Sequence, residues 1–458
     1  MSDERISTAL NSATDTQSVS IGEGVLPSAD ELFEQSFGDR PAVVVADDNT
    51  YEVAGREVER QLEAAGRALV ERRVFPGRPT LYADYRNIEN LIGALRAHRA
   101  IPVAVGAGTL NDIVKRAAYE CERPYMSVAS AASMDGYTAF GAAITKEGYK
   151  QTMTCPAPRA VLADLGVLTA APPKMTSAGY ADLLSKVTAG ADWLVADALE
   201  VEAIDPSVWS LVQGPLRDAT ARPAELHAGD RQAMDALIEG LIMSGLAMQA
   251  AASSRPASGA EHQFSHLWEM EGLGHEHHDD EPPLSHGFKV GIGTLAIASL
   301  YERLLARDLS NLDADAIAAS WPSWDEVERS VRAAHTTPGL DEAAVKESQA
   351  KYVDADALRQ RLSLLQERWP DLRKRVQDQL LPAKQLREQL RAAGAPTHPE
   401  EIGLSLDAFQ DTYRRARMIR RRYTILDLTT ETGLLGELVD ELFAADGFWA
   451  RTTARTGR

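Results

Sequence analysis

The sequence is poor in cysteine and in basic side chains. Only two cysteines, Cys121 and Cys155, occur in 458 residues, so a disulfide framework cannot stabilise the fold and a reducing compartment is expected. Lysine and arginine number 48 against 67 aspartate and glutamate, a net charge of −19. A surface this acidic repels nucleic-acid backbones and anionic lipid headgroups. We therefore expect neither nucleic acid nor a membrane among its partners.

The sequence also lacks the features that are typical of a secretory signal peptide or a membrane-spanning helix. Residues 1–24 are polar and acidic, without the basic start and apolar core of a signal peptide. The most apolar long stretch starts at Leu237, is interrupted by Glu239 and ends in serines, which favours a buried helix over a span. We expect a cytoplasmic protein whose residues 1–30 form a flexible polar tail.

The chain changes character near Ala170. Before it, five short apolar runs alternate with helical patterns: PAVVVA, PTLYAD, IPVAVG, YMSVAS and AVLAD. Such alternation indicates βαβ units and a parallel sheet. After it nearly every segment has helical periodicity, with a charged, solvated region from Trp324 to about Ala393. We predict a Rossmann-like α/β domain at 31–170 and an all-α domain at 171–458.

The segment IPVAVGAGTLNDIVKRAAYE predicts a strand, a turn at Gly106 and Gly108, and a helix. Free backbone N–H groups at such a helix start can hold a pyrophosphate, and glycines give it clearance. The full GxGxxG pattern is absent, so an ordinary turn with a Thr or Asn helix cap is the alternative. Asp112 in the first turn and Asp47 at the end of the first strand are further cofactor candidates, Asp47 as an acceptor for a ribose.

Histidines cluster in one part of the chain. Six of the ten lie from His262 to His286, and His262 and His266 share a helix face among apolar neighbours, where an imidazole needs a partner or a metal. Two imidazoles and a carboxylate suit zinc, nickel, iron(II), manganese or cobalt, with one position open for catalysis. Asp182 is the candidate carboxylate, its alternative being an ordinary helix aspartate. The HEHHDDE run at 275–281 is interpreted as a solvated loop without orienting residues.

Five motifs, in order along the chain, carry a family resemblance: GAGTLNDIVK, SVASAASMDGYTA, AGYADLLSK, SGAEHQFSHLWEM and SHGFKVGIGTL. They resemble the polyol branch of the iron-containing alcohol dehydrogenases, in particular the family of bacterial sn-glycerol-1-phosphate dehydrogenases. The resemblance implies a dehydroquinate synthase-like fold that holds NAD or NADP and one divalent metal between its two domains. Zinc or nickel is expected in preference to iron. It also implies a homo-oligomer that interconverts dihydroxyacetone phosphate and sn-glycerol 1-phosphate.

The resemblance assigns roles to individual positions. It implies that the metal ligands are Asp182, His262 and His286, with Asp182 also beside the substrate. It implies substrate contacts and catalytic roles for Asp135 and His266. The implied cofactor contacts are Gly106, Ala107, Gly108, Thr109, Leu110, Ser130, Ala131, Ala132 and Ser133. A phosphorylated substrate also needs a cation, for which Lys289 and the arginine-rich run at 414–422 are candidates.

Three other functions stay open at this point. One is a dehydrogenase of another polyol or a sugar-derived alcohol, since motif spacing does not define the pocket. A lyase related to dehydroquinate synthase is disfavoured because Asp182 replaces the usual glutamate and GAEHQFSH differs from GHTxGHA. A non-catalytic nucleotide-binding sensor is the third.

The sequence also departs from the family motif at Ala129-Ser130, where the family usually has Pro-Thr.

Overall fold

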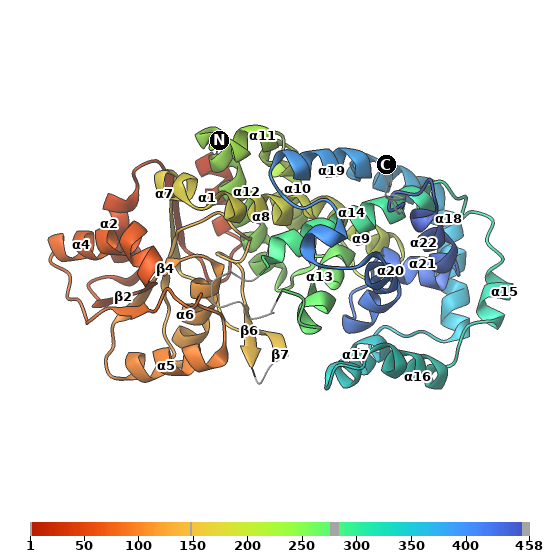
Figure 1. Cartoon of the computed structure of the whole chain (residues 1–458), viewed down its shortest axis with the longest axis horizontal. Helices are drawn as coiled ribbons and strands as arrows, with labels where there is room; N and C mark the ends of the chain where they lie inside the picture. Colours follow the sequence, from red (N-terminus) through yellow and green to blue (C-terminus); the bar gives the residue numbers. More distant parts are fainter. Residues whose placement is uncertain (1, 147–148, 275–283, 451–458) are drawn as a thin grey trace, which may run out of the picture.

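The fold was obtained as a computed structural model, which describes residues 2–146, 149–274 and 284–450. A parallel sheet with its helices comes first, and a larger helical body follows (Figure 1). The predicted fold class, an α/β region followed by an all-α region, is confirmed. The six-stranded sheet has the order β1-β8-β5-β4-β2-β3 and all its pairs are parallel. Its strands are β1 (Ser18–Gly22), β2 (Ala42–Asp47), β3 (Arg73–Phe75), β4 (Ile101–Gly106), β5 (Met126–Ala129) and β8 (Ala160–Asp164).

Helices cover both faces of this sheet, which explains the continuous apolar strands. In β2, Val44 and Ala46 pack on the side of α2 and α4, whereas Val43 and Val45 pack on the side of α5 and α6. These helices are α2 (Ala29–Phe37), α4 (Arg56–Ala64), α5 (Tyr85–Arg96) and α6 (Gly108–Glu120). Short helices α3 (Asp48–Thr50) and η2 (Tyr51–Gly55) precede α4.

Two local predictions differ from the structure, and one pair of strands was not predicted. Residues 2–30, expected to be a flexible tail, instead contain α1 (Ser2–Leu10), the edge strand β1 and η1 (Leu26–Ser28). Parallel pairing of β1 with β8 satisfies their backbone groups, although the side chains of SVSIG are only partly buried. The PTLYAD run is not a strand. The edge strand that pairs with β2 is instead Arg73–Phe75, and Asp84 at the end of the run caps the N-terminus of α5. An antiparallel hairpin, β6 (Ala142–Lys146) with β7 (Tyr149–Met153), was not predicted.

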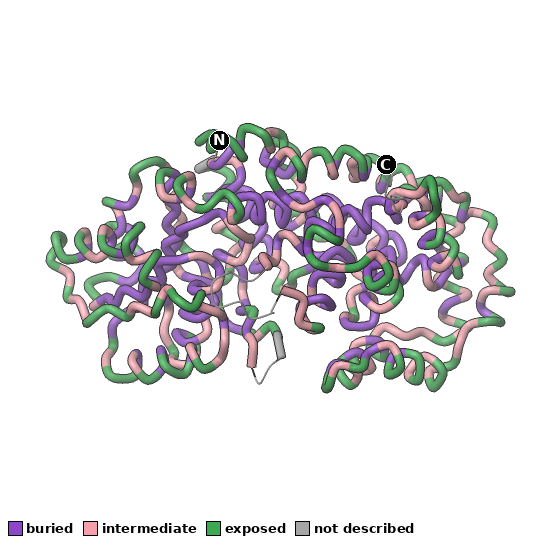
Figure 2. The backbone as a smooth tube through the Cα atoms, in the orientation of Figure 1, coloured by how far each residue is buried: buried purple, intermediate pink, exposed green. Residues whose placement is uncertain are grey.

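The helical body starts directly after the sheet, with α7 following β8 close to the expected boundary near Ala170. Its buried centre is formed by α8, α9, α12, α13 and α14, where the purple tube is most continuous in Figure 2. Its elements are α7 (Leu165–Ala170), α8 (Pro173–Leu184), α9 (Lys186–Ala198), α10 (Pro206–Ala219), α11 (Pro223–His227), α12 (Arg231–Ala251), η3 (Arg255–Ala257), α13 (Ala260–Met270), α14 (His286–Leu305), α15 (Ala314–Ala319), α16 (Trp324–Ala334), α17 (Leu340–Gln349), α18 (Ala355–Gln379), α19 (Ala383–Ala392), η4 (Pro399–Ile402), α20 (Leu406–Arg415), η5 (Ala416–Ile419), α21 (Ile425–Glu431) and α22 (Leu435–Phe443).

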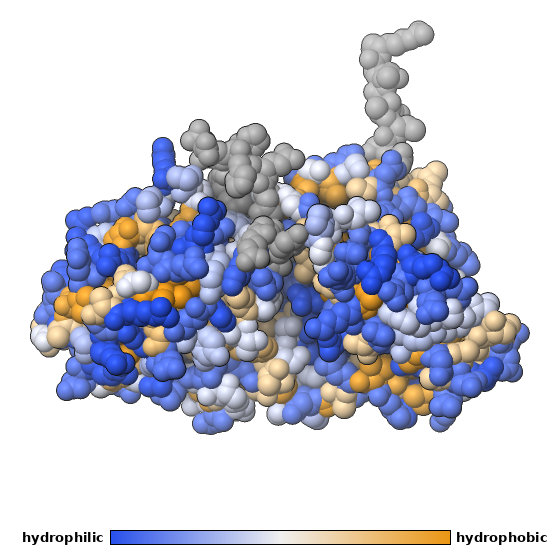
Figure 3. All heavy atoms as spheres, turned by 90° about the horizontal axis from the view of Figure 1, so that it is seen from below, coloured by the Kyte–Doolittle hydropathy of each residue, from blue (hydrophilic) through white to orange (hydrophobic). Residues whose placement is uncertain are grey.

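The apolar stretch from Leu237 lies inside α12 and is buried there. In the described part of the chain, no helix combines the length and the apolarity that a membrane crossing requires. Hydrophilic side chains predominate on the face drawn in Figure 3, in keeping with the acidic composition.

Candidate metal and nucleotide site

Asp182, His262 and His286 come together although three different helices carry them. Asp182 is in α8, His262 is in α13, and His286 is the first residue of α14. One ligand atom from each lies within 4.8 Å of the other two, and the two imidazole centroids are 5.5 Å apart. Asp182 and His262 are buried, whereas the His286 side chain is 31% exposed. A carboxylate and two imidazoles in this arrangement can hold a divalent cation and leave a position open.

Two glutamates orient the imidazoles, and this supports the fit to a metal. Glu261 Oε1 lies 2.9 Å from His262 Nδ1, and Glu269 Oε1 lies 2.9 Å from His286 Nδ1. Each contact leaves the other ring nitrogen, Nε2, available for a cation, as in carboxylate–histidine–metal triads. Glu261 is itself held by the Thr188 hydroxyl at 2.9 Å.

Lys186 forms ion pairs with two carboxylates of the site. Its Nζ lies 2.8 Å from Asp182 Oδ1 and 2.9 Å from Asp135 Oδ2. Burial alone would raise the pKa of Asp182, but the Lys186 ammonium and His262 hold it below its usual value. Burial opposes the charge on Lys186 as well, yet the two carboxylates raise its pKa. The sequence analysis missed Lys186. Its position four residues after Asp182 in a helical pattern was a usable signal, because side chains at that spacing are neighbours.

Asp135, a predicted substrate contact, lies beside this cluster. Its backbone N–H donates to Asp182 Oδ2 at 3.0 Å, and the Ser244 hydroxyl donates to its Oδ2 at 2.9 Å. Its side chain is 15% exposed. The carboxylate therefore has a fixed position at the edge of the buried cluster.

His266 lies one helical turn beyond His262, and its ring centroid is 6.0 Å from that of His262 and 5.8 Å from that of His286. The guanidinium of Arg420 lies 2.7 Å from His266 Nδ1. Arginine can only donate, so Nδ1 is the acceptor and Nε2 carries the hydrogen. Burial, followed by the charge of Arg420, lowers the pKa of His266 well below its ordinary value. His266 is therefore neutral.

Lys289, the other cationic candidate, is buried and close to the same carboxylate that orients His286. Its Nζ lies 3.2 Å from Glu269 Oε1. The HEHHDDE run at 275–281 lies outside the described residues.

The predicted nucleotide turn lies at the carboxyl edge of the sheet. β4 ends at Gly106, Ala107 is the N-cap, and α6 starts at Gly108, so Thr109 and Leu110 are in its first turn. Ala107 offers no side chain to the first N–H groups of the helix, which leaves them to an anion or to water. Ser130–Ser133 follow β5 on the neighbouring strand, and the Ser130 N–H donates to Gly106 O at 3.1 Å.

Two predicted cofactor residues have partners inside the protein. Asp47 caps α3 by accepting the Thr50 N–H at 2.9 Å. Asp112 accepts the Ala143 N–H at 3.1 Å and so connects α6 to the hairpin. Both are near the expected cofactor edge, and their contact with a nucleotide stays a prediction.

A close helix contact connects the nucleotide edge to the metal cluster. A Cβ on Gly179 of α8 would lie 1.9 Å from Ala132 O, so only glycine lets α8 approach the segment of Ser130–Ser133. The same helix carries Asp182, and Asp135 follows Ser133 almost directly. One short region of chain therefore joins the two candidate sites.

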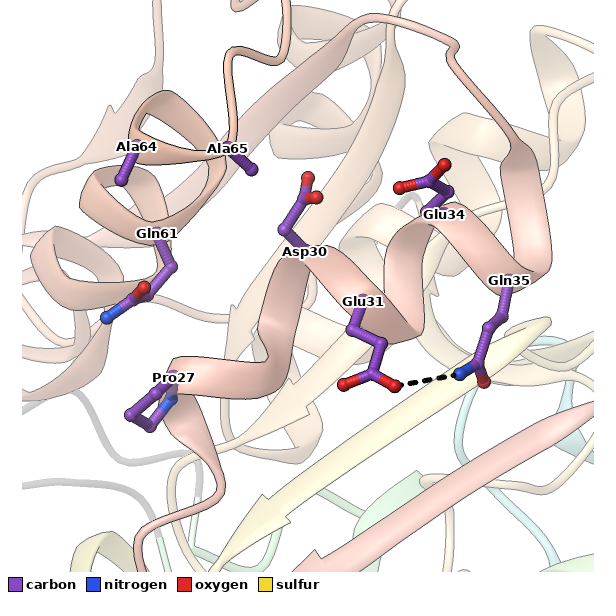
Figure 4. A pocket seen from close by; sticks show the side chains of 8 residues that line it. All are labelled: Pro27, Asp30, Glu31, Glu34, Gln35, Gln61, Ala64 and Ala65. Atoms are coloured by element: carbon purple, nitrogen blue, oxygen red, sulfur yellow. Dashed lines mark hydrogen bonds between the residues drawn. The ribbon is translucent and has the colours of Figure 1, made fainter.

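A surface pocket between α2 and α4 is separate from this site (Figure 4). Three carboxylates on α2, Asp30, Glu31 and Glu34, line it together with Gln61 of α4. Asp30 is paired with Arg67. An acidic lining does not suit the phosphates of a nucleotide, so the pocket does not replace the carboxyl edge of the sheet as cofactor candidate.

Comparisons with known proteins agree with this geometry. Residues 20–172 match the sequence family described as iron-containing alcohol dehydrogenase. Relatives from Bacillus velezensis and Bacillus subtilis, both named glycerol-1-phosphate dehydrogenase with NAD(P)+, are 32% and 30% identical. The alignments cover 86% of both chains in the first case, and 93% of this chain and 95% of the relative in the second. A relative of the same name from Halalkalibacterium halodurans is 40% identical over 57% of this chain and 64% of its own length.

Solved structures share the fold. A probable glycerol dehydrogenase from Sinorhizobium meliloti has a TM-score of 0.58 at 15% identity, covering 93% of this chain and 98% of its own. Glycerol dehydrogenase from Schizosaccharomyces pombe has a TM-score of 0.57 at 15% identity, covering 93% and 91%. On the evidence of its nearly full-length sequence relatives, the chain belongs to the iron-containing alcohol dehydrogenase family, in the group whose members are named glycerol-1-phosphate dehydrogenase.

Proposed function

We propose that this protein is a metal-dependent, NAD(P)-linked dehydrogenase that interconverts dihydroxyacetone phosphate and sn-glycerol 1-phosphate. The observation that carries the proposal is the cluster of Asp182, His262 and His286 next to an uncapped helix start at the edge of a parallel sheet. The names of the nearly full-length relatives support the substrate pair.

The described residues fit both a divalent cation and a nicotinamide cofactor. Asp182, His262 and His286 would hold a divalent cation, for which zinc or nickel is preferred to iron. Such a cation supplies Lewis acidity toward a ketone oxygen. The segments Gly106–Leu110 and Ser130–Ser133 would hold NAD or NADP, which supplies the hydride.

His266 is suited to donate a hydrogen bond to the substrate. Because its Nδ1 accepts from Arg420, its Nε2–H is the group left to face a ligand. Releasing that hydrogen would leave an anionic imidazole, which is far less stable than the neutral ring. We therefore assign His266 the role of hydrogen-bond donor in preference to proton relay.

Asp135 and Lys186 position the other side of the substrate. The Asp135 carboxylate can accept a hydrogen bond from a hydroxyl of the substrate, while its contacts with Lys186 and Ser244 hold it in place. Lys186 is buried between two carboxylates, so its ammonium balances the negative charge that would otherwise disfavour a phosphorylated ligand.

A metal-reconstitution assay tests the proposal. Metal-depleted protein is loaded with zinc, nickel, iron(II) or manganese and assayed for oxidation of NADH and NADPH with dihydroxyacetone phosphate or dihydroxyacetone. We expect metal-dependent turnover that strongly favours the phosphorylated ketone. Asp182→Ala should abolish this rate while circular dichroism shows a folded protein.

Two results would contradict the proposal. Equal or better turnover of dihydroxyacetone would indicate a dehydrogenase of an unphosphorylated polyol. Absence of turnover with every metal and both cofactors would favour a nucleotide-binding sensor. The preference between NAD and NADP, the homo-oligomer and the cytoplasmic location stay predictions.

A further inference from the structure

Most of the arginine-rich run at 414–422 has partners that explain its charge. Four of its six arginines contact carboxylates or backbone and hydroxyl oxygens of the chain: Arg415 with Glu271 and Asp411, Arg417 with Asp427, Arg421 with Glu347, and Arg422 with Ser258 and Ser254. Arg414 is exposed. Arg420 remains to be explained.

Arg420 is a partly buried cation with no ion-pair partner among the described residues. Among the residues that the structure describes, no carboxylate lies within 4.0 Å of its guanidinium, and its hydrogen bond goes to His266 Nδ1 at 2.7 Å. Burial lowers the pKa of Arg420, and the charges of Glu347 and Glu269 only partly offset this. Holding an unneutralised guanidinium in such a place costs free energy unless an anion joins it.

The position of Arg420 relative to the metal cluster indicates which anion this is. Its guanidinium lies 2.7 Å from His266 Nδ1, and the His266 ring centroid is 6.0 Å from that of His262 and 5.8 Å from that of His286. Arg420 is thus one side chain away from the cluster, so a ligand that binds at the cluster and lies alongside His266 can extend to Arg420. In dihydroxyacetone phosphate the phosphorus is three bonds from the ketone carbon, so a phosphate is the group expected there.

We propose that Arg420 binds the phosphate of the substrate and thereby makes the enzyme select a phosphorylated ketone. This inference rests on the proposed function. A guanidinium has five N–H donors, so the one used on His266 leaves others for the paired hydrogen bonds that phosphate accepts. Lys289 is less suited, because its ammonium is already 3.2 Å from Glu269, which orients His286.

The test compares two variants of Arg420 with a matched control. Arg420→Gln removes the charge but keeps an N–H donor for His266, and Arg420→Lys keeps the charge but loses the paired donors. The control is Arg421→Gln, whose parent side chain is 60% exposed and pairs with Glu347 at the surface. KM and kcat are measured for dihydroxyacetone phosphate, dihydroxyacetone and NADH, and the Kd of inorganic phosphate is measured by calorimetry without turnover.

Arg420→Gln should raise KM for dihydroxyacetone phosphate about 10- to 100-fold, the effect of losing a charge-assisted hydrogen bond. The Kd of inorganic phosphate should rise by a similar factor, while KM for NADH and for dihydroxyacetone should change less than about twofold. Arg420→Lys should give an intermediate, phosphate-specific rise, and Arg421→Gln should match the parent protein.

The inference is overturned if Arg420→Gln lowers the efficiency of both ketones equally, since Arg420 would then only position His266. Unchanged KM and phosphate Kd overturn it as well. If the glutamine variant does not fold, the lysine variant decides by the same comparison of the two ketones. Turnover of dihydroxyacetone phosphate by the parent protein tests the proposed function separately, whatever the variants show.

Discussion

Glu269 connects a candidate metal ligand, His286, to a lysine through a single carboxylate oxygen. Its Oε1 lies 2.9 Å from His286 Nδ1 and 3.2 Å from Lys289 Nζ. Glu269→Gln removes the charge that fixes the His286 tautomer, so affinity for zinc should fall about 10- to 100-fold. The measurement is a competition titration against a zinc chelator.

Glu271→Gln is the matched control, because Glu271 lies two residues further on and pairs with Arg415 outside the cluster. The control should keep the zinc affinity of the parent protein. If both variants bound zinc equally well, the orienting role of Glu269 would be wrong.

Among single residues of the candidate site, those within a sequence motif could be predicted, whereas those that only the fold brings to the site could not. His262 and His266 were found from their helical spacing, Asp182 and His286 were candidates from the local sequence, and the family resemblance assigned the ligand roles. Glu261 and Glu269 adjoin the histidines in SGAEHQFSHLWEM, and glutamates are common on any helix, so nothing marked them. The run at 414–422 was a candidate, but the sequence could not single out Arg420, because it is 154 residues from His266 and only tertiary packing brings the two together.

Helix α8 contacts the nucleotide edge through a position that only glycine can occupy. In Gly179→Ala the added Cβ would lie 1.9 Å from Ala132 O, which must move the segment that lines the expected cofactor site. We expect the Kd of NADH to rise at least about 10-fold, in the range of misplaced binding groups. Fluorescence titration with NADH measures it.

Gly93→Ala is the control for this change. Gly93 is an exposed residue inside α5 and a Cβ there meets no atom within 4 Å, so alanine should raise the free energy of unfolding by about 0.5–1 kcal/mol through helix propensity. Equal NADH affinity in both variants would show that the α8 contact does not shape the cofactor site.

Helix α16 ends at a histidine whose burial makes stability depend on pH. His335 is buried, and Arg415 donates to the neighbouring Ala334 O at 2.8 Å. Burial, followed by the charge of Arg415, lowers the pKa of His335 from 6.5 to about 4. The unfolded chain then binds the proton more readily, so this contribution is complete above about pH 6.5 and is lost as the pH falls toward 4.

Between pH 7 and pH 4 the parent protein should therefore lose up to about 3 kcal/mol more of its free energy of unfolding than His335→Gln loses. Urea denaturation of both proteins across this range measures the difference. Parallel curves would mean that His335 is protonated in the folded protein as easily as in the unfolded chain.

Elements were predictable where burial is two-sided or strongly periodic. The apolar runs of β2, β4, β5 and β8 indicated a parallel sheet because helices cover both of its faces. β1 and β3 are edge strands with partly exposed side chains, so their sequences carry no comparable signal. The hairpin of β6 and β7 was missed for the same reason, since β6 alternates buried and exposed residues over a short length.

For the molecule as a whole, the sequence indicated two regions and a site between them, but not how they are joined. The join is local: Asp135 donates its backbone N–H to Asp182 in the helical body, and the same segment of chain begins at the sheet with Ser130. A cation at the cluster and a nucleotide at the sheet edge would therefore order one continuous stretch of backbone.

This shared stretch predicts that metal and cofactor bind cooperatively. A metal that orients Asp182 also fixes the Asp135 backbone, so part of the ordering that NADH requires is already complete. We expect zinc to lower the Kd of NADH about 5-fold or more, a coupling at the lower end of the usual range. Calorimetry of NADH with metal-depleted and zinc-loaded protein measures it.

Linkage requires NADH to raise zinc affinity by the same factor, which a chelator titration with and without NADH checks independently. In Gly179→Ala, where the cofactor segment is displaced, the coupling should shrink, so the zinc affinities measured with and without NADH should differ less than in the parent protein. Equal NADH affinity with and without zinc in the parent protein would mean that the sheet edge and the metal cluster act as independent sites.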